Sequence, residues 1–464
     1  MYAGWDTPVR QLKAEMVQLE YEGYPVPESI RVQVEQLHDT LDAFNEQKIQ
    51  TLYTAFQNLA QDPNYNYVQP NDLRGIRRER PDGPRQLPLP LNDDELLDRF
   101  HGAWTGRACG CALGKPVERL GMVGHAGVNG RQAIRAYLQK RNQWPLDYYF
   151  SGQEKDDGMK ILFKDSWREN IAGMEPDDDI NYSLIGLKVL EEKGPGFKWH
   201  DVARTWNSSL PYYAICTAET QAIMNFNLKA PRIGNEVVFP SPAFTRRYNN
   251  PYREWIGAQI RADGWAYACA GLPELAAEFA WRDAHWTHTA NGIYGEMFVA
   301  AMIASAFAES DPHRLVEIGL SEIPKHCKLA EAVRYALKWV QDCPDFEAFM
   351  LRLEKDYGTL SPVHTVNNAL IVVMSLFYGA MEPDRSICIS VMGGLDTDCN
   401  GATTGSITGA SVGRLNFGGQ LAAPLNDTIR SHVIGFQTMT MEELAGRTLA
   451  VHKAVRTYTQ KRKD

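Results

Sequence analysis

The sequence lacks the segments that would direct it to a membrane, and it has little cysteine. It contains no apolar run of about 18 residues, and its N-terminus lacks the basic-then-apolar pattern of a signal peptide. Eight cysteines in 464 residues are too few for a disulfide scaffold. We therefore expect a reduced, cytoplasmic protein that does not bind a membrane.

Two kinds of binding protein are also disfavoured. Cys109 and Cys111 form a Cys-x-Cys pair, but no second pair has the spacing of a zinc site, so we interpret both as small buried residues. The net charge of −9 argues against a broad nucleic-acid surface. A hydrophobic content of 44% leaves enough apolar residues for a sizeable core.

Alternating β-branched runs are rare, whereas helical spacing of apolar residues is common, above all from 272 to 454. This predicts an all-α fold: a compact multi-helix domain over 92–464 with an added N-terminal segment, 1–91. In that segment, 34–44 and 49–59 predict an amphipathic helical hairpin for packing or homo-oligomerisation. Residues 61–91, rich in proline and arginine, predict a linker or wrapping arm.

The second domain is predicted to begin with a helix, since Asn92 and Glu95 resemble a capping box. Glycine then recurs every fourth residue, at Gly102, Gly106, Gly110 and Gly114. Glycine costs about 1 kcal/mol per helical position relative to alanine. The stripe therefore predicts close approach by another helix or a ligand. Residues 121–170 are expected to be an irregular insertion, 183–225 helical, and 226–256 a substrate-facing loop.

The most informative motif is an aspartate pair, Asp396 and Asp398, on a loop that begins with Gly393 and Gly394. Mg²⁺ and Mn²⁺ prefer such oxygen ligands. The alternative is a turn whose aspartates only cap the next helix.

A second acidic cluster, Asp177–Asp179, precedes an apolar segment with helical character. One aspartate at a helix N-terminus needs no functional account, and a solvated acidic N-terminus is the alternative here. Three adjacent carboxylates repel one another, however, which favours a counter-cation. Together the two clusters predict a metal site.

Four segments, in this order, resemble motifs of the ADP-ribosylglycohydrolase family, which includes the dinitrogenase reductase-activating glycohydrolase. They are Gly110–Glu118, Asp177–Asp179, Trp286–His288 and Gly394–Asn400. The chain is thereby identified as a divergent member over about residues 92 to 455. The resemblance implies an all-helical fold, two Mg²⁺ or Mn²⁺ ions in a cleft, and hydrolysis at the anomeric carbon of an ADP-ribosyl group.

The resemblance also implies roles for individual residues. The metal ligands would be Asp177, which replaces a family threonine, with Asp178, Asp179, Asp396 and Asp398. Glu118, Asp178 and Asp179 are the catalytic candidates, and the base that orients water is left open between Glu118 and the triplet. The substrate-binding candidates are Arg261, His288, Gly393, Gly394 and Asn400.

Three departures from the family pattern bear on the chemistry. Cys111 stands where the family has an aspartate, and Cys399 where a threonine often supplies a ligand, although a thiol is a poor partner for Mg²⁺. Ile256–Asp263 replaces a glycine-rich segment that helps to hold ADP-ribose. We therefore expect a metal-dependent glycohydrolase of a small-molecule or ADP-ribosylated substrate. The alternatives are a hydrolase of another glycoside or nucleoside, or a non-catalytic carbohydrate- or nucleotide-binding relative.

Overall fold

Helices make up most of the chain, and the predicted all-α fold class is confirmed. The structure is a computed structural model that describes residues 6–39, 43–228, 232–233 and 236–462. Strands in these residues form two antiparallel pairs: β1 (Arg232–Ile233) with β2 (Glu236–Val237), and β3 (Thr428–Arg430) with β4 (Thr438–Thr440). None of the described helices is both long enough and apolar enough to span a bilayer.

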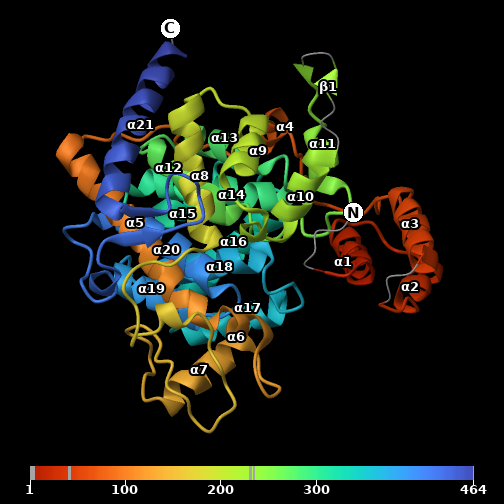
Figure 1. Ribbon diagram of the computed structural model, residues 1–464, viewed down its shortest axis with the longest axis horizontal. Coiled ribbons are helices and arrows are strands. Elements are labelled where there is room, and N and C mark those ends of the chain that lie inside the picture. Colours follow the sequence, from red (N-terminus) through yellow and green to blue (C-terminus); the bar gives the residue numbers. More distant parts are fainter. Residues whose placement is uncertain (1–5, 40–42, 229–231, 234–235, 463–464) are drawn as a thin grey trace.

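Two long helices, α5 (Asp93–Gly114) and α20 (Thr397–Val412), lie side by side in the left half of the domain as Figure 1 shows it. Helix α5 begins at the predicted capping box, where Asn92 and Glu95 each accept a hydrogen bond from the other's backbone N–H. A Cβ on Gly106 would lie 2.5 Å from the carbonyl carbon of Gly405. The glycine stripe thus brings the two backbones into contact, as predicted for a second helix.

Other helices pack around this pair and complete one large hydrophobic core. The inner ones are α8 (Asp178–Lys193), α12 (Ala262–Ala268), α14 (Ala290–Ala306), α18 (Thr365–Tyr378) and α19 (Pro383–Met392). The outer ones are α9 (Trp199–Ser209), α10 (Thr217–Leu228), α13 (Pro273–Ala284), α15 (Pro312–Leu320), α16 (Lys328–Asp342), α17 (Phe346–Tyr357) and α21 (Met441–Lys461). Every residue of α14 is buried, so the Ala/Met-rich sequence of that helix serves packing.

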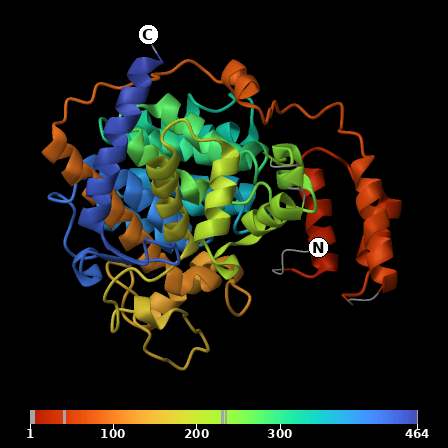
Figure 2. The ribbon, with the colours of Figure 1, turned by 45° about the horizontal axis from the view of Figure 1, so that its top comes forward.

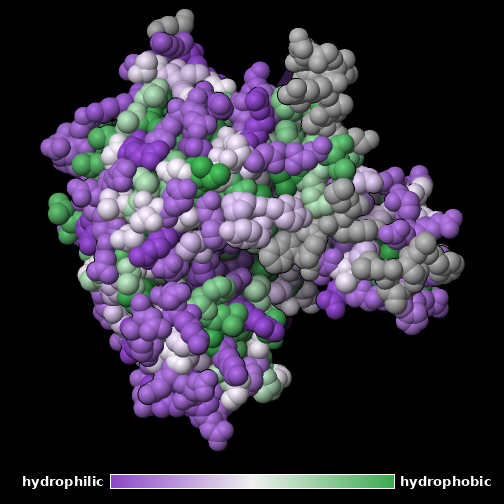
Figure 3. Space-filling model, in the orientation of Figure 1, coloured by the Kyte–Doolittle hydropathy of each residue, from purple (hydrophilic) through white to green (hydrophobic). Residues whose placement is uncertain are grey.

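The N-terminal segment has a small core of its own, to one side of the main body (Figure 1). Three helices form it, α1 (Pro8–Tyr21), α2 (Glu28–Glu35) and α3 (Ala43–Gln57), instead of the two of the predicted hairpin. Pro25 and Pro27 separate α1 from α2, because proline cannot continue a helix. Residues 40–42 of the predicted first helix lie outside the described part. The described residues of α1–α3 on the face in Figure 3 are mainly hydrophilic.

Helix α1 is held to the second domain by buried polar contacts. Arg253, only 1% exposed, donates to Glu15 of α1 and to Glu22, the C-cap of that helix, each at 2.7 Å. Gln18 donates to Glu254 at 3.0 Å. The segment around Arg253, expected to face the substrate, is therefore covered by α1. A homo-oligomer formed through the N-terminal helices stays a prediction.

Residues 61–91 run as an arm across the top of the domain and contain one helix, α4 (Leu73–Glu79) (Figure 2). Arginines of the arm pair with glutamates of the domain beneath: Arg77 with Glu278 at 2.8 Å, and Arg85 with Glu322 at 2.7 Å. These ion pairs fasten the arm along its path.

Two segments expected to be irregular contain short helices. The insertion holds α6 (Glu118–Val123) and α7 (Gly130–Lys140), at the bottom of Figure 1. Asn129 caps α7 by accepting from the N–H of Gln132 at 3.0 Å, which is a local sequence signal for the start of this helix. The second segment holds β1, β2 and α11 (Pro242–Arg247).

Candidate metal centre

The loop before α20 brings Asp396 and Asp398 to the end of α5. Gly394 and Leu395 have φ angles of 75° and 56°, so the chain reverses through two consecutive left-handed residues. This region is unfavourable for leucine, which indicates that the surroundings hold the turn in place. The hydroxyl of Thr397 donates to the carbonyl of Gly114 at 2.8 Å and joins the start of α20 to α5.

The triplet Asp177–Asp179 forms the N-terminus of α8. Asp177 is the N-cap, and its carboxylate accepts from the N–H of Asp179 at 3.1 Å. Arg107, fully buried in α5, donates to the carbonyl of Asp179 at 2.6 and 3.0 Å and to its carboxylate at 3.2 Å. Helix α5 therefore anchors both acidic motifs.

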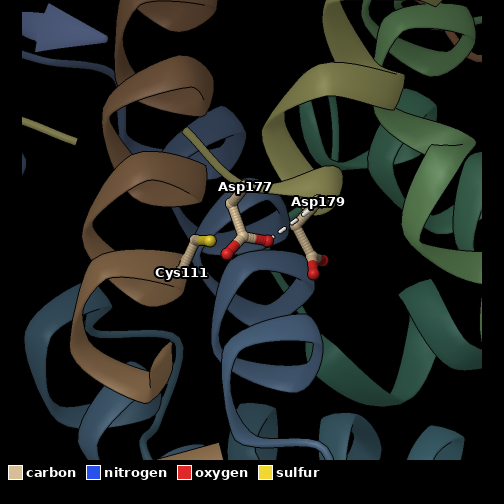
Figure 4. A group of neighbouring side chains, drawn as sticks. All are labelled: Cys111, Asp177 and Asp179. Carbon is tan, nitrogen blue, oxygen red and sulfur yellow. Dashed lines mark hydrogen bonds between the residues drawn. The ribbon is translucent and has the colours of Figure 1, made fainter. Parts of the chain in front are cut away.

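Side chains from α5, α6, α8 and α20 come close enough to share a cation. Three groups have potential ligand atoms within 4.8 Å of one another: Glu118, Asp396 and Asp398; Asp179, Asp398 and Cys399; Cys111, Asp177 and Asp179. Figure 4 shows the sulfur of Cys111 on α5 directed toward the carboxylate of Asp177. Asp178 lies in the first turn of α8 and, within the described residues, joins none of these groups.

The carboxylates raise one another's pKa. The pKa of Glu118 is raised first by the charge of Asp398 and then by burial. Burial, followed by the charge of Asp177, raises the pKa of Asp398 to about 6, and burial and then Asp398 raise the pKa of Asp396. A bound divalent cation would relieve this repulsion, because it would favour the ionised form of each group.

The first group, Glu118 with Asp396 and Asp398, fits a hard cation best. Asp396 is 4% exposed, and its Oδ1 finds no hydrogen-bond partner in the described part of the chain. A buried acceptor without a partner is costly, so a ligand for that oxygen is favoured. The three side chains offer oxygen atoms only, as Mg²⁺ and Mn²⁺ prefer.

The opposite side of the centre is chemically different. The Nζ of Lys115 lies 2.9 Å from Oδ2 of Asp177 and donates to the carbonyl of Pro176 at 2.5 Å. The thiol of Cys399 donates to the carboxylate of Asp179 at 3.1 Å. Lys115 lies between Gly110 and Glu118, in a motif that carries the resemblance, but its residue type alone does not indicate a role in the centre.

Comparisons with known proteins identify the family of the chain. A family model, ADP-ribosylglycohydrolase, matches residues 92–457. The chain belongs to the ADP-ribosylglycohydrolase family. A solved structure described as an ADP-ribosylglycohydrolase-related protein complex is similar over 78% of this chain and 99% of that chain, with 18% identity and a TM-score of 0.47. No curated protein matches the chain.

Within this member of the family, Asn400 lies next to the candidate metal ligands Asp396 and Asp398 and is fixed by α18. Its amide donates to Oδ1 of Asn368 at 2.7 Å, and the same oxygen accepts from the N–H of Asp396 at 3.2 Å. Asn368, which no sequence signal indicated, thus positions the ligand loop. Gly393 and Leu395 line a cavity of about 350 Å³ beside this loop. Substrate contacts of Asn400, Gly393 and Gly394 stay predictions.

The other two substrate candidates, Arg261 and His288, lie in a separate buried cluster. Arg261 donates to Glu219, to Asp283 at 2.6 Å and to Thr287 at 3.0 Å. Thr287 and the Nδ1 of His288 are 2.8 Å apart. Neither residue belongs to the three groups of candidate metal ligands described above, among the described residues. Their role in substrate binding stays a prediction.

Proposed function

We propose that the chain is a divalent-metal-dependent glycohydrolase that cleaves an N- or O-glycosidic bond at the anomeric carbon of an ADP-ribosyl or related ribosyl substrate. Family membership supports a hydrolase that acts on glycosidic bonds. The single observation that carries the metal dependence is the group of Glu118, Asp396 and Asp398, with the unpartnered buried oxygen of Asp396.

The residues of the centre suit this chemistry. A bound Mg²⁺ or Mn²⁺ would polarise sugar hydroxyl groups and lower the pKa of a nearby water. Glu118, half-buried at the start of α6, would hold the attacking water and accept its proton. The carboxylates of Asp178 and Asp179 would stabilise the positive charge that develops on the sugar ring.

A second candidate is a metal-dependent hydrolase of another small glycoside or nucleoside. The observation that favours it concerns Arg261, the one residue retained from the family's glycine-rich segment. Its guanidinium is 1% exposed and is already paired with Glu219 and Asp283. An arginine so occupied offers little to a pyrophosphate, so a substrate without that group deserves equal testing.

The test combines metal binding with a substrate panel. Asp396→Asn and Asp398→Asn should abolish the thermal stabilisation by Mn²⁺ and reduce turnover by more than the roughly 10- to 100-fold typical of an outer-shell loss. Asp342→Asn, on an exposed carboxylate of α16, is the matched control and should behave as wild type. The panel holds ADP-ribosyl-arginine, ADP-ribosyl-serine, nucleosides and simple glycosides, each with Mg²⁺, Mn²⁺ or chelator.

The outcomes separate the alternatives. If Mn²⁺ still stabilised both variants as it does the wild type, the proposed metal site would be wrong. Turnover of nucleosides or glycosides alone would favour the second candidate. Binding of panel compounds without any turnover would favour a non-catalytic relative and overturn the assignment as a hydrolase.

A further inference from the structure

The carboxylate oxygens around Lys115 already have donors. Asp177 accepts from Lys115 through Oδ2 and from the N–H of Asp179 through Oδ1. Asp179 in turn accepts from Arg107 through Oδ1 and from the thiol of Cys399 through Oδ2. A metal ion at this side would have to displace donors that the fold itself supplies.

Lys115 is built into this position. Its side chain is 6% exposed, and Asp177 is 8% exposed. The ammonium group contacts the Asp177 carboxylate, the carbonyl of Pro176 and the ring face of Phe163, whose centroid is 4.8 Å away. An isolated ammonium would be costly to bury, whereas three such partners compensate its desolvation. Lys115 thus neutralises the carboxylate that stands where the resemblance expects a neutral threonine.

The potential metal-ligand atoms that remain on this side include two thiol sulfurs. Cys111 belongs to the group with Asp177 and Asp179, and Cys399 to the group with Asp179 and Asp398. Thiol sulfur is a poor ligand for Mg²⁺ or Mn²⁺. By contrast, Glu118, Asp396 and Asp398 offer only oxygens, and one of these is buried without a partner among the described residues.

We propose that the Lys115 ammonium group takes the place of one of the two cations that the resemblance implies. The centre then binds a single divalent ion, at Glu118, Asp396 and Asp398. This inference rests on the metal site of the proposed function and specifies how many ions that site holds.

The test is metal stoichiometry on the full chain, with Mn²⁺ as the probe. Equilibrium dialysis followed by metal analysis should give one Mn²⁺ per chain. Electron paramagnetic resonance should show the hyperfine pattern of an isolated ion, without the exchange coupling of a pair. Lys115→Met should raise the stoichiometry to two and produce a coupled signal. Lys115→Arg, which keeps the charge, is the matched control and should stay at one.

Failure of this inference can be distinguished from failure of the proposed function. Two coupled Mn²⁺ ions in the wild type would overturn the role of Lys115 and leave the metal site intact. The absence of any Mn²⁺ binding, or binding that survives Asp396→Asn, would overturn the site itself. A stoichiometry of one in folded Lys115→Met would show that Lys115 does not exclude the second ion. If Lys115→Met does not fold, the wild-type stoichiometry and spectrum decide alone.

Discussion

The contact between α5 and α20 makes a sharp prediction for Gly106→Ala. The added Cβ would lie 2.5 Å from the carbonyl carbon of Gly405 and nearer still to its oxygen, whereas ordinary van der Waals contact begins at 3.4 Å. The helices would have to separate by roughly 1 Å, because both partners are backbone and neither can change rotamer. We expect overpacking to lower the free energy of unfolding by about 3 kcal/mol, the upper part of its range. The better helix propensity of alanine should offset about 1 kcal/mol of this loss.

The matched control is Gly446→Ala in α21. Apart from the nearby backbone of α21 itself, no atom of the described residues lies within 4 Å of the Cβ that this change would add. Only the difference in helix propensity should therefore change the stability. That variant should be more stable by up to about 1 kcal/mol, the opposite sign from Gly106→Ala. Denaturant unfolding followed by circular dichroism measures both. The reasoning would be refuted if Gly106→Ala were as stable as the wild type or more stable. It would also be refuted if the Mn²⁺ affinity stayed unchanged, because separation of the helices moves Asp396 and Asp398.

Two further predictions concern buried charges. Burial raises the pKa of Glu296 well above its ordinary value, so folding takes up a proton there and stability falls as pH rises above the unfolded value of about 4.5. Glu296→Gln should therefore flatten the decline in unfolding free energy from pH 5 to 8, and an unchanged slope would contradict this. Arg253→Met leaves Glu15 and Glu22 buried without their cation and should cost about 3–5 kcal/mol. Limited proteolysis should then release α1, whereas Arg10→Ala, on a side chain that is 68% exposed, should not.

The parts of the centre that follow from local chemistry could be predicted from the sequence. Asp177 both caps α8 and belongs to an acidic group, so the two interpretations of that motif are compatible. The glycine spacing predicted a close helix contact, because a costly residue repeated every four positions needs a packing reason. The sequence did not tell which helix would make that contact, since the partner glycines lie about 300 residues away.

The contacts that remained hidden are long-range and involve ordinary residues. Asn368 holds the candidate ligand loop from the first turn of a mostly apolar helix, where nothing distinguishes it from a buried polar residue of the core. The ion-pair partners of Arg261 likewise come from distant segments, those around Glu219 and Asp283. Both cases depend on tertiary neighbours, and sequence periodicity identifies a face of a helix without identifying what covers it.

Helix α5 carries two adjacent rows of side chains, each with a spacing of four residues. The glycine row, including Gly106, receives α20. The next row consists of Arg107 and Cys111 and continues to Lys115, the C-cap of α5. All three face the start of α8: Arg107 and Lys115 through hydrogen bonds and ion pairs, Cys111 within the group around Asp177. Residues four apart share a helix face, so one helix can fix the backbone contact and the charge of the centre independently. Under the proposed function, substitution at position 111 or 115 would therefore change which cations the centre binds while the glycine contact that assembles it stays intact.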